Sequence, residues 1–240
     1  MTTRVFSSGI RRREDPRLIT GRASYTGDIK LPGMIHAAIL RSPYAHARIK
    51  YVDTSAAEGQ PGVLSVFTGQ DTDGVLNAIP CAWLVPDSDL KTPDHPAIAK
   101  DRVRYVGDAV AVVVAESRYQ AEDALEHIDV DYETLDVVVN PKDAAQDGAP
   151  QLHDDVPNNI AFTWAVAGGD ADDAFSNADV TVNDTITLQR LIANAMEPRA
   201  AIAQWVSATG DLTLWSTSQN PHIARFLTSV VTEVPEHKIR

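Results

Sequence analysis

The stretch that decides the fold of the first half of the chain runs from residue 109 to residue 133 and reads AVAVVVAESRYQAEDALEHIDVDYE. Its first seven residues are all apolar, which is typical of a strand buried on both faces. Ser117 follows and has Gln120 three residues later, the spacing of a helix capping box. From Ile128 onward, apolar and acidic residues alternate as in a half-buried strand. The stretch therefore predicts a β-α-β unit.

Upstream of this unit, short apolar runs predict two further strands, over residues 35–40 and 63–67. The sequence between residues 53 and 62 is rich in loop-forming residues. Residues 77–96 contain four prolines and little periodicity, which favours a long surface excursion without regular structure.

A second pattern of elements follows a connector over residues 142–157, which is rich in Asp, Gln, Gly and Pro. The expected elements are a helix capped by Asp170, a strand over 180–188, a hairpin of strands 201–206 and 212–215, a helix that begins at Asn220-Pro221 and ends near Pro235, and the opening of a strand at 238–240.

These patterns divide the chain into three parts. Residues 1–20 are polar and basic, and because Pro16 disfavours a helix, we expect an extended arm. Residues 21–141 form the first domain. Residues 142–240 form the first part of a second domain, which we expect to be incomplete.

Composition excludes several classes of protein. The 240 residues carry 21 basic and 33 acidic side chains, and the formal net charge of -12 disfavours binding to nucleic acid. The single cysteine, Cys81, excludes an internal disulfide framework and a cysteine-ligated iron–sulfur cluster within the chain. No apolar stretch approaches the length of a membrane span, and we expect a cytoplasmic protein.

Two places in the second region could carry chemistry. Residues 196–199, Met-Glu-Pro-Arg, put opposite charges between two predicted strands, where side chains can face a cleft. A loop salt bridge would explain them equally well. Residues 216–222, Ser-Thr-Ser-Gln-Asn-Pro-His, precede a predicted helix, whose first backbone N–H groups favour an anionic ligand, although simple helix capping is the alternative. The seven histidines include no pair at i, i+4 spacing, so no sequence-local metal site is expected.

Several blocks, in order, resemble the large subunits of molybdenum hydroxylases, the family of xanthine dehydrogenase, aldehyde oxidase and aerobic carbon monoxide dehydrogenase. The blocks are residues 12–28 (RREDPRLITGRASYTGD), 36–46 (HAAILRSPYAH), 104–115 (RYVGDAVAVVVA), 119–124 (YQAEDA), 196–200 (MEPRA) and 218–222 (SQNPH). Ordered blocks of this kind are far more specific than one motif.

The resemblance implies an α+β fold, in which an α/β-hammerhead domain is followed by the beginning of a mixed α/β molybdopterin-binding domain. It implies an oxidoreductase that hydroxylates an aldehyde, an N-heterocycle or a carbon monoxide-type carbon with water-derived oxygen. The implied cofactor is molybdenum–molybdopterin, in a cytosine dinucleotide form by analogy. Electrons would pass to 2Fe-2S and FAD centres in an iron–sulfur subunit and an FAD-binding subunit.

The resemblance also assigns residues. Gln219 matches a family glutamine that approaches a molybdenum oxygen ligand, which implies a cofactor contact. Glu197, Arg199 and Asn220 match the vicinity of the active site. No catalytic residue and no direct metal ligand is expected in this chain, because the family's glycine-rich cofactor segment, substrate loop and glutamate base match none of its residues.

We therefore expect the chain to be inactive alone and to need the remainder of the molybdopterin-binding subunit as a partner, together with its sister subunits and a small-molecule substrate. The alternative is a non-catalytic piece that binds sister subunits without a cofactor.

Overall fold

The first domain is built on a sheet with β5 at its centre. The computed structural model describes residues 9, 11–81, 83 and 85–240. β5 (Ala109–Ala115) lies between β1 (His36–Arg41) and β3 (Val63–Thr68), and both pairings are antiparallel. The continuous apolar run is explained by this position, because Val110 and Val113 are fully buried. The three predicted strands are confirmed.

A second sheet has the order β4-β2-β6 and consists of β4 (Arg102–Val103), β2 (Ala47–Asp53) and β6 (Asp129–Thr134). Its apolar face includes Ala47 and Val103, which are both fully buried. β6 was predicted, whereas the sequence had indicated neither β2 nor β4. In β2, Arg48 and Lys50 alternate with apolar residues, which is the pattern of a half-buried strand and could have indicated it. β4 has only two residues, too few to show a periodic pattern.

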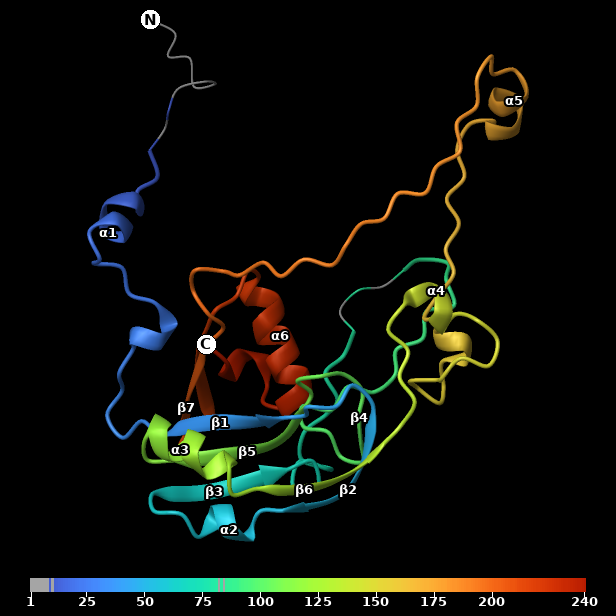
Figure 1. The fold of residues 1–240 in the computed structure, drawn as a ribbon. Helices are drawn as coiled ribbons and strands as arrows, with labels where there is room; N and C mark the ends of the chain where they lie inside the picture. The colour runs from blue at the N-terminus through green and yellow to red at the C-terminus, as the bar shows by residue number, and fades with distance from the viewer. Residues whose placement is uncertain (1–8, 10, 82, 84) are drawn as a thin grey trace, which may run out of the picture.

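Helix α3 (Arg118–Leu125) covers the first sheet and packs on β1 and β5 through Ala121 and Ala124 (Figure 1). Ser117 accepts a hydrogen bond from the Gln120 backbone N–H, as the capping pattern predicted. The predicted β-α-β order is correct, but β5 and β6 lie in different sheets. Both edges of β5 are already occupied by β1 and β3, so no edge of β5 is left for β6.

The N-terminal part differs from the expected arm. Residues 15–19 form helix α1 (Asp15–Ile19), with Pro16 in its first turn. Proline is tolerated there because the first backbone N–H groups of a helix have no partner within it. The prediction of an extended chain is therefore wrong for these residues, although none of them is buried. Residues 1–8 and 10 of the predicted arm lie outside the described residues. A 3₁₀ turn, η1 (Thr26–Asp28), follows.

The middle of the chain has few regular elements. Helix α2 (Ser55–Glu58) lies in the predicted loop region, and the described residues between 77 and 96 contain no helix or strand. The connector contains α4 (Pro141–Ala144) and the 3₁₀ turn η2 (Pro157–Asn159). Helix α5 (Ala171–Ser176) is capped by Asp170, as predicted.

The predicted strand over residues 180–188 is wrong. The residues form no described strand, and Val182 and Leu188 are 84% and 90% exposed. The alternating pattern is present, but a strand requires a neighbouring strand for its backbone hydrogen bonds, and the described residues pair no strand with this segment.

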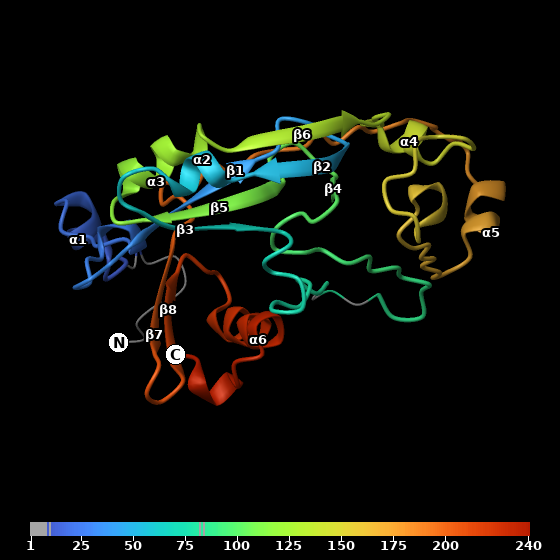
Figure 2. The ribbon, with the colours of Figure 1, turned by 90° about the horizontal axis from the view of Figure 1, so that it is seen from below.

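The last part of the chain, from β7 onward, lies beside the two sheets (Figure 2). β7 (Ala201–Val206) and β8 (Asp211–Ser216) make the predicted antiparallel hairpin, and Gly210 provides the positive φ of +68° that its turn needs. α6 (Pro221–Thr232) and the 3₁₀ turn η3 (Glu236–Lys238) follow.

The chain then returns parallel to β8. Ile239 pairs with Leu212, and the Arg240 backbone N–H donates to the Leu212 carbonyl at 2.9 Å. Of the predicted strand opening at residues 238–240, only Ile239 forms a bridge, and Lys238 belongs to η3. Across the described part of the chain, no helix has the length and apolar character needed to cross a membrane.

Candidate functional site

The candidate site centres on the loop between β8 and α6. β8 ends at Ser216 and α6 begins at Pro221, so residues 217–220 connect the carboxyl end of a strand to the amino end of a helix. The Ser218 hydroxyl accepts a hydrogen bond from the Asn220 backbone N–H at 3.1 Å. Asn220 stands at the N-cap position, but its side chain makes no capping hydrogen bond. Ser218 therefore stabilises this turn through its hydroxyl, and the Asn220 side chain takes no part in capping α6.

A second loop, residues 196–200, lies against the first. The Thr217 backbone N–H donates to the Ala200 carbonyl at 3.1 Å. The Ala200 N–H donates to the Thr217 hydroxyl, and that hydroxyl donates to the Pro198 carbonyl, both at 3.4 Å. These bonds bring together the two stretches that the sequence singled out. Thr217 joins them, a role that was not predicted because its partners lie in a different loop.

The four predicted site residues differ in their surroundings. Gln219, Asn220 and Arg199 are exposed, and within the described chain no hydrogen bond or ion pair involves their side chains. Glu197 is half-buried, and its carboxylate accepts a hydrogen bond from the Thr26 backbone N–H at 3.0 Å. Among the described residues no ion pair joins Glu197 to Arg199, so the loop salt bridge is not present. Glu197 instead ties this loop to the N-terminal segment.

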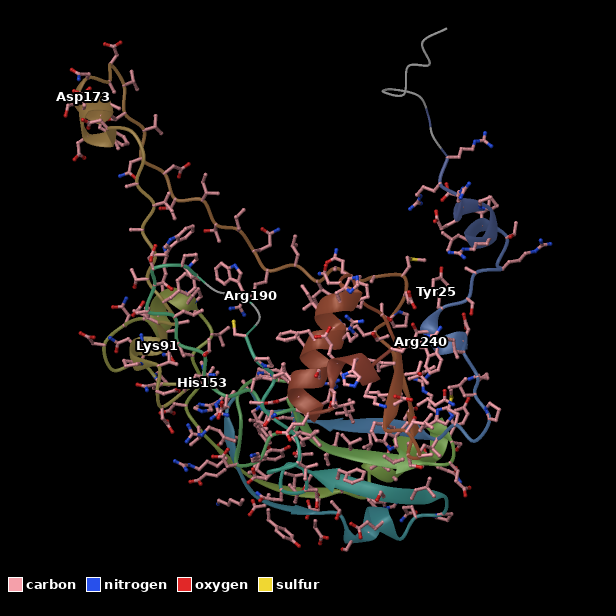
Figure 3. All side chains as sticks on the ribbon, turned by 180° about the vertical axis from the view of Figure 1, so that it is seen from behind. Tyr25, Lys91, His153, Asp173, Arg190 and Arg240 are labelled. Atoms are coloured by element: carbon pink, nitrogen blue, oxygen red, sulfur yellow. The ribbon has the colours of Figure 1, made fainter. Side chains whose placement is uncertain are left out.

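A cavity of about 330 Å³ lies at the amino end of α6. Its polar lining includes the hydroxyls of Ser216 and Ser218, His222 and two arginines. Arg225 is bound to Glu236 at 2.8 and 3.0 Å, whereas no ion pair in the described part of the chain involves Arg240. Figure 3 shows Arg240 beside α6 and the β7–β8 hairpin. The sequence did not indicate either arginine.

The electrostatics of this cavity favour an anionic group. The amino end of a helix presents unpaired N–H groups and a partial positive charge. Arg240 adds a full positive charge, and the serine hydroxyls can donate hydrogen bonds. The described residues contain no cluster of three or more His, Cys, Asp or Glu side chains placed to bind a metal ion. The arrangement is therefore suited to holding a negatively charged cofactor or ligand through polar contacts.

Another cavity, of about 200 Å³, lies where residues 94–108 meet the connector. His95 and Tyr105 stack there with ring centroids 6.3 Å apart. Burial raises the pKa of Tyr105, and the Asp108 charge adds to this. Burial lowers the pKa of His153 in the same cavity, and the Arg104 charge lowers it further. The lining residues differ from those of the cavity at α6.

Two family models match the chain. Residues 20–136 match the model described as aldehyde oxidase and xanthine dehydrogenase, a/b hammerhead domain, and residues 152–240 match the molybdopterin cofactor-binding domain. The expected fold class is confirmed.

Curated relatives include the nicotine 6-hydroxylase large subunit of Paenarthrobacter nicotinovorans, 38% identical over 96% of this chain, and the carbon monoxide dehydrogenase large chain of Afipia carboxidovorans, 36% identical over 95%. The chain spans only 28% and 29% of the length of these relatives.

Two solved structures have a fold similar to that of this chain. Quinoline 2-oxidoreductase from Pseudomonas putida 86 matches with a TM-score of 0.84 and 37% identity, over 96% of this chain and 29% of that chain. The aldehyde oxidoreductase from Desulfovibrio gigas matches with a TM-score of 0.85 and 29% identity, over 95% of this chain and 25% of that chain.

Proposed function

The chain belongs to the family of molybdenum hydroxylase large subunits, and we propose that its β8–α6 loop forms part of the surface that holds the molybdenum cofactor. The observation that carries the proposal is the exposed Gln219 beside a cavity that favours anions at the amino end of α6. In Gln219, the exposed amide can donate a hydrogen bond to an oxygen of a bound group.

The residues at this cavity fit a molybdopterin. The cofactor carries phosphate, which helix N–H groups, hydroxyls and a guanidinium bind well. Ser218 and Arg240 would hold the anionic part, and Gln219 would contact the metal's oxygen. Asn220, Glu197 and Arg199 would support this surface. When bound, the cofactor supplies the redox chemistry of hydroxylation, and a cytosine dinucleotide form is part of the proposal.

The proposed reaction is the hydroxylation of an aldehyde, an N-heterocycle or carbon monoxide with oxygen from water. The names of the relatives support these classes, since they include a nicotine hydroxylase and carbon monoxide dehydrogenases. The proposed partners are an iron–sulfur subunit, an FAD-binding subunit and the remainder of the molybdopterin-binding subunit. Electrons leave through 2Fe-2S and FAD centres in these partners, in a cytoplasmic complex, and this chain alone is inactive.

A Gln219→Ala substitution tests the assigned contact. We expect turnover of the assembled complex to fall by a factor on the order of 10², because a donor to a reacting centre is lost. Gln204→Ala is the matched control, since Gln204 is an exposed glutamine of β7, outside this loop. Assembly, measured by gel filtration, should persist in both variants. Unchanged turnover in Gln219→Ala would contradict the assignment.

Metal content tests the proposal as a whole. Elemental mass spectrometry of the complex captured through a tag on this chain should give about one molybdenum per chain. A folded, stoichiometric complex without molybdenum would instead identify the chain as a non-catalytic piece that binds its sister subunits.

A further inference from the structure

The carboxyl end of α6 is capped by a residue from the first domain. The Asn77 side-chain amide donates to the Val230 carbonyl at 2.9 Å, and the Asn77 backbone N–H donates to the Val231 carbonyl, also at 2.9 Å. The same amide donates to the Glu233 carboxylate at 3.2 Å. The last carbonyls of a helix lack partners within the helix. Asn77 thus satisfies two of them, although Val230 lies 153 positions away in the sequence and Val231 is the next residue.

The helix end itself does not supply such a cap. Glu233 follows the last turn in the left-handed region, at φ 59°, where glycine is the usual residue. Inside the helix, the hydroxyls of Thr228 and Thr232 bond to carbonyls one turn back. Those carbonyls belong to Ala224 and Thr228, so these hydroxyls do not reach the Val230 and Val231 carbonyls, which accept hydrogen bonds from Asn77.

The opposite end of the same unit is also tied to the N-terminal half of the chain. Glu197 accepts from the Thr26 N–H at 3.0 Å, and Thr217 links the Glu197 loop to the loop that carries Gln219. The hairpin and helix are therefore held at two separate points. One lies beside Gln219, and the other lies at the far end of α6.

We propose that Asn77 is a positioning residue, which fixes the carboxyl end of α6 and thereby the placement of the Gln219 loop at its amino end. This inference rests on the proposed role of Gln219. α6 has 12 residues and spans about 18 Å. A helix of this length transmits a displacement of one end to the other, because its backbone hydrogen bonds make it a rigid element. Ile223 and Phe226 of α6 are about half exposed, so much of the helix surface is not packed against the rest of the chain. The contacts at its two ends therefore contribute more to holding the helix in place.

Amide hydrogen exchange in the purified complex tests the proposal. Asn77→Ala removes the side-chain bonds and keeps the backbone N–H. We expect peptides covering residues 226–234 and peptides covering 216–224 to exchange about five-fold faster, the effect of losing roughly one net hydrogen bond. Peptides from β5 and α3 should not change. Asn77→Asp should act in the same way, since it keeps the size of the side chain but replaces the donor by an acceptor.

Val75→Ala is the control, because Val75 lies two residues from Asn77, is 67% exposed and has an apolar side chain that cannot hydrogen-bond to α6. Faster exchange confined to residues 226–234 in both Asn77 variants would overturn the proposal, since Asn77 would then be a local cap only. The exchange readout does not depend on the cofactor. If Gln219→Ala leaves turnover unchanged while the Asn77 variants loosen residues 216–224, the function proposed above fails and the positioning role survives.

Discussion

The surroundings of a single side chain determine how its protonation affects stability. They also determine whether its contacts can be predicted from the sequence. His153 is half-buried in the cavity between residues 94–108 and the connector. Burial and the charges of Arg104 and His95 lower its pKa, and Asp154 and Asp155 oppose them in part. The folded protein therefore binds a proton at this imidazole less readily than the unfolded chain does.

This difference predicts a loss of stability in mild acid. The ordinary pKa of 6.5 applies to the unfolded chain and the lowered value to the folded one. As pH falls below about 6.5, the unfolded state gains the proton first, so the free energy of unfolding decreases until pH passes the lowered pKa. Chemical denaturation of His153→Gln between pH 5 and 7 should show a smaller decrease than the parent. The same decrease in His153→Gln as in the parent would contradict the prediction.

For single residues, the sequence predicts contacts with partners that are close in the chain. Ser117 and Asp170 were identified as caps, and their partners lie three residues away. Thr26 and Asn77 were not identified, because their partners lie 171 and 153 positions away. The sequence singled out the loops of Glu197 and Gln219, but only a family resemblance assigned roles to these two residues. Their residue types alone left a loop ion pair and helix capping open as alternatives.

Among the elements, β3 ends in a close approach that depends on a glycine. A Cβ on Gly69 would lie 2.2 Å from the Ala99 carbonyl oxygen and 2.7 Å from its carbon. Both are backbone atoms, and the Ala99 N–H is bonded to the Ala109 carbonyl at 2.8 Å. The neighbouring chain therefore cannot move away without disturbing β5.

Gly69→Ala should therefore destabilise the first domain by about 3 kcal/mol, the cost of overpacking a rigid contact. Gly59→Ala is the matched control, because a Cβ there meets only ordinary contacts at 3.7 Å. We expect that control to stay within about 0.5 kcal/mol of the parent. Urea denaturation of the two variants would measure the difference. Equal midpoints would contradict the close approach.

Elements with a strong internal pattern were predictable. β5 has an unbroken apolar run and α6 a clear apolar stripe, and both were found in the expected places. The sequence carried less information about which strands pair with one another. The sequence could not show that β1 and β3 occupy both edges of β5. An alternating pattern over 180–188 predicted a strand, but the described chain provides no partner for it.

On the scale of the whole molecule, one long segment within the second region joins α5 to β7. Figure 1 shows the chain between α5 and β7 as an extended segment. Residues 179–195 contain no helix or strand and are exposed along their length, with Ile192 86% exposed. Such backbone fits readily into a protease active site.

Brief digestion with trypsin should therefore cut first after Arg190. Arg118 is the internal comparison, because it lies in α3 and is held there by Glu122 at 2.8 Å. We expect mass spectrometry to detect the Arg190 cut well before any cut after Arg118. In the assembled complex the Arg190 cut should slow, if partners cover this segment. A first cut after Arg118 would contradict the exposed connection.

The two-point attachment of the hairpin and α6 has a consequence for the order of folding. Synthesis proceeds from the N-terminus, so Thr26, Asn77 and every strand of the first two sheets are made before residues 197–234. The parallel pairing of Ile239 with Leu212 needs the chain to pass through α6 first. We therefore expect the first domain to fold first and to guide the docking of the hairpin and α6 during biosynthesis. A destabilising substitution in the first domain would then impair folding of the Gln219 loop, even when every residue of that loop is unchanged.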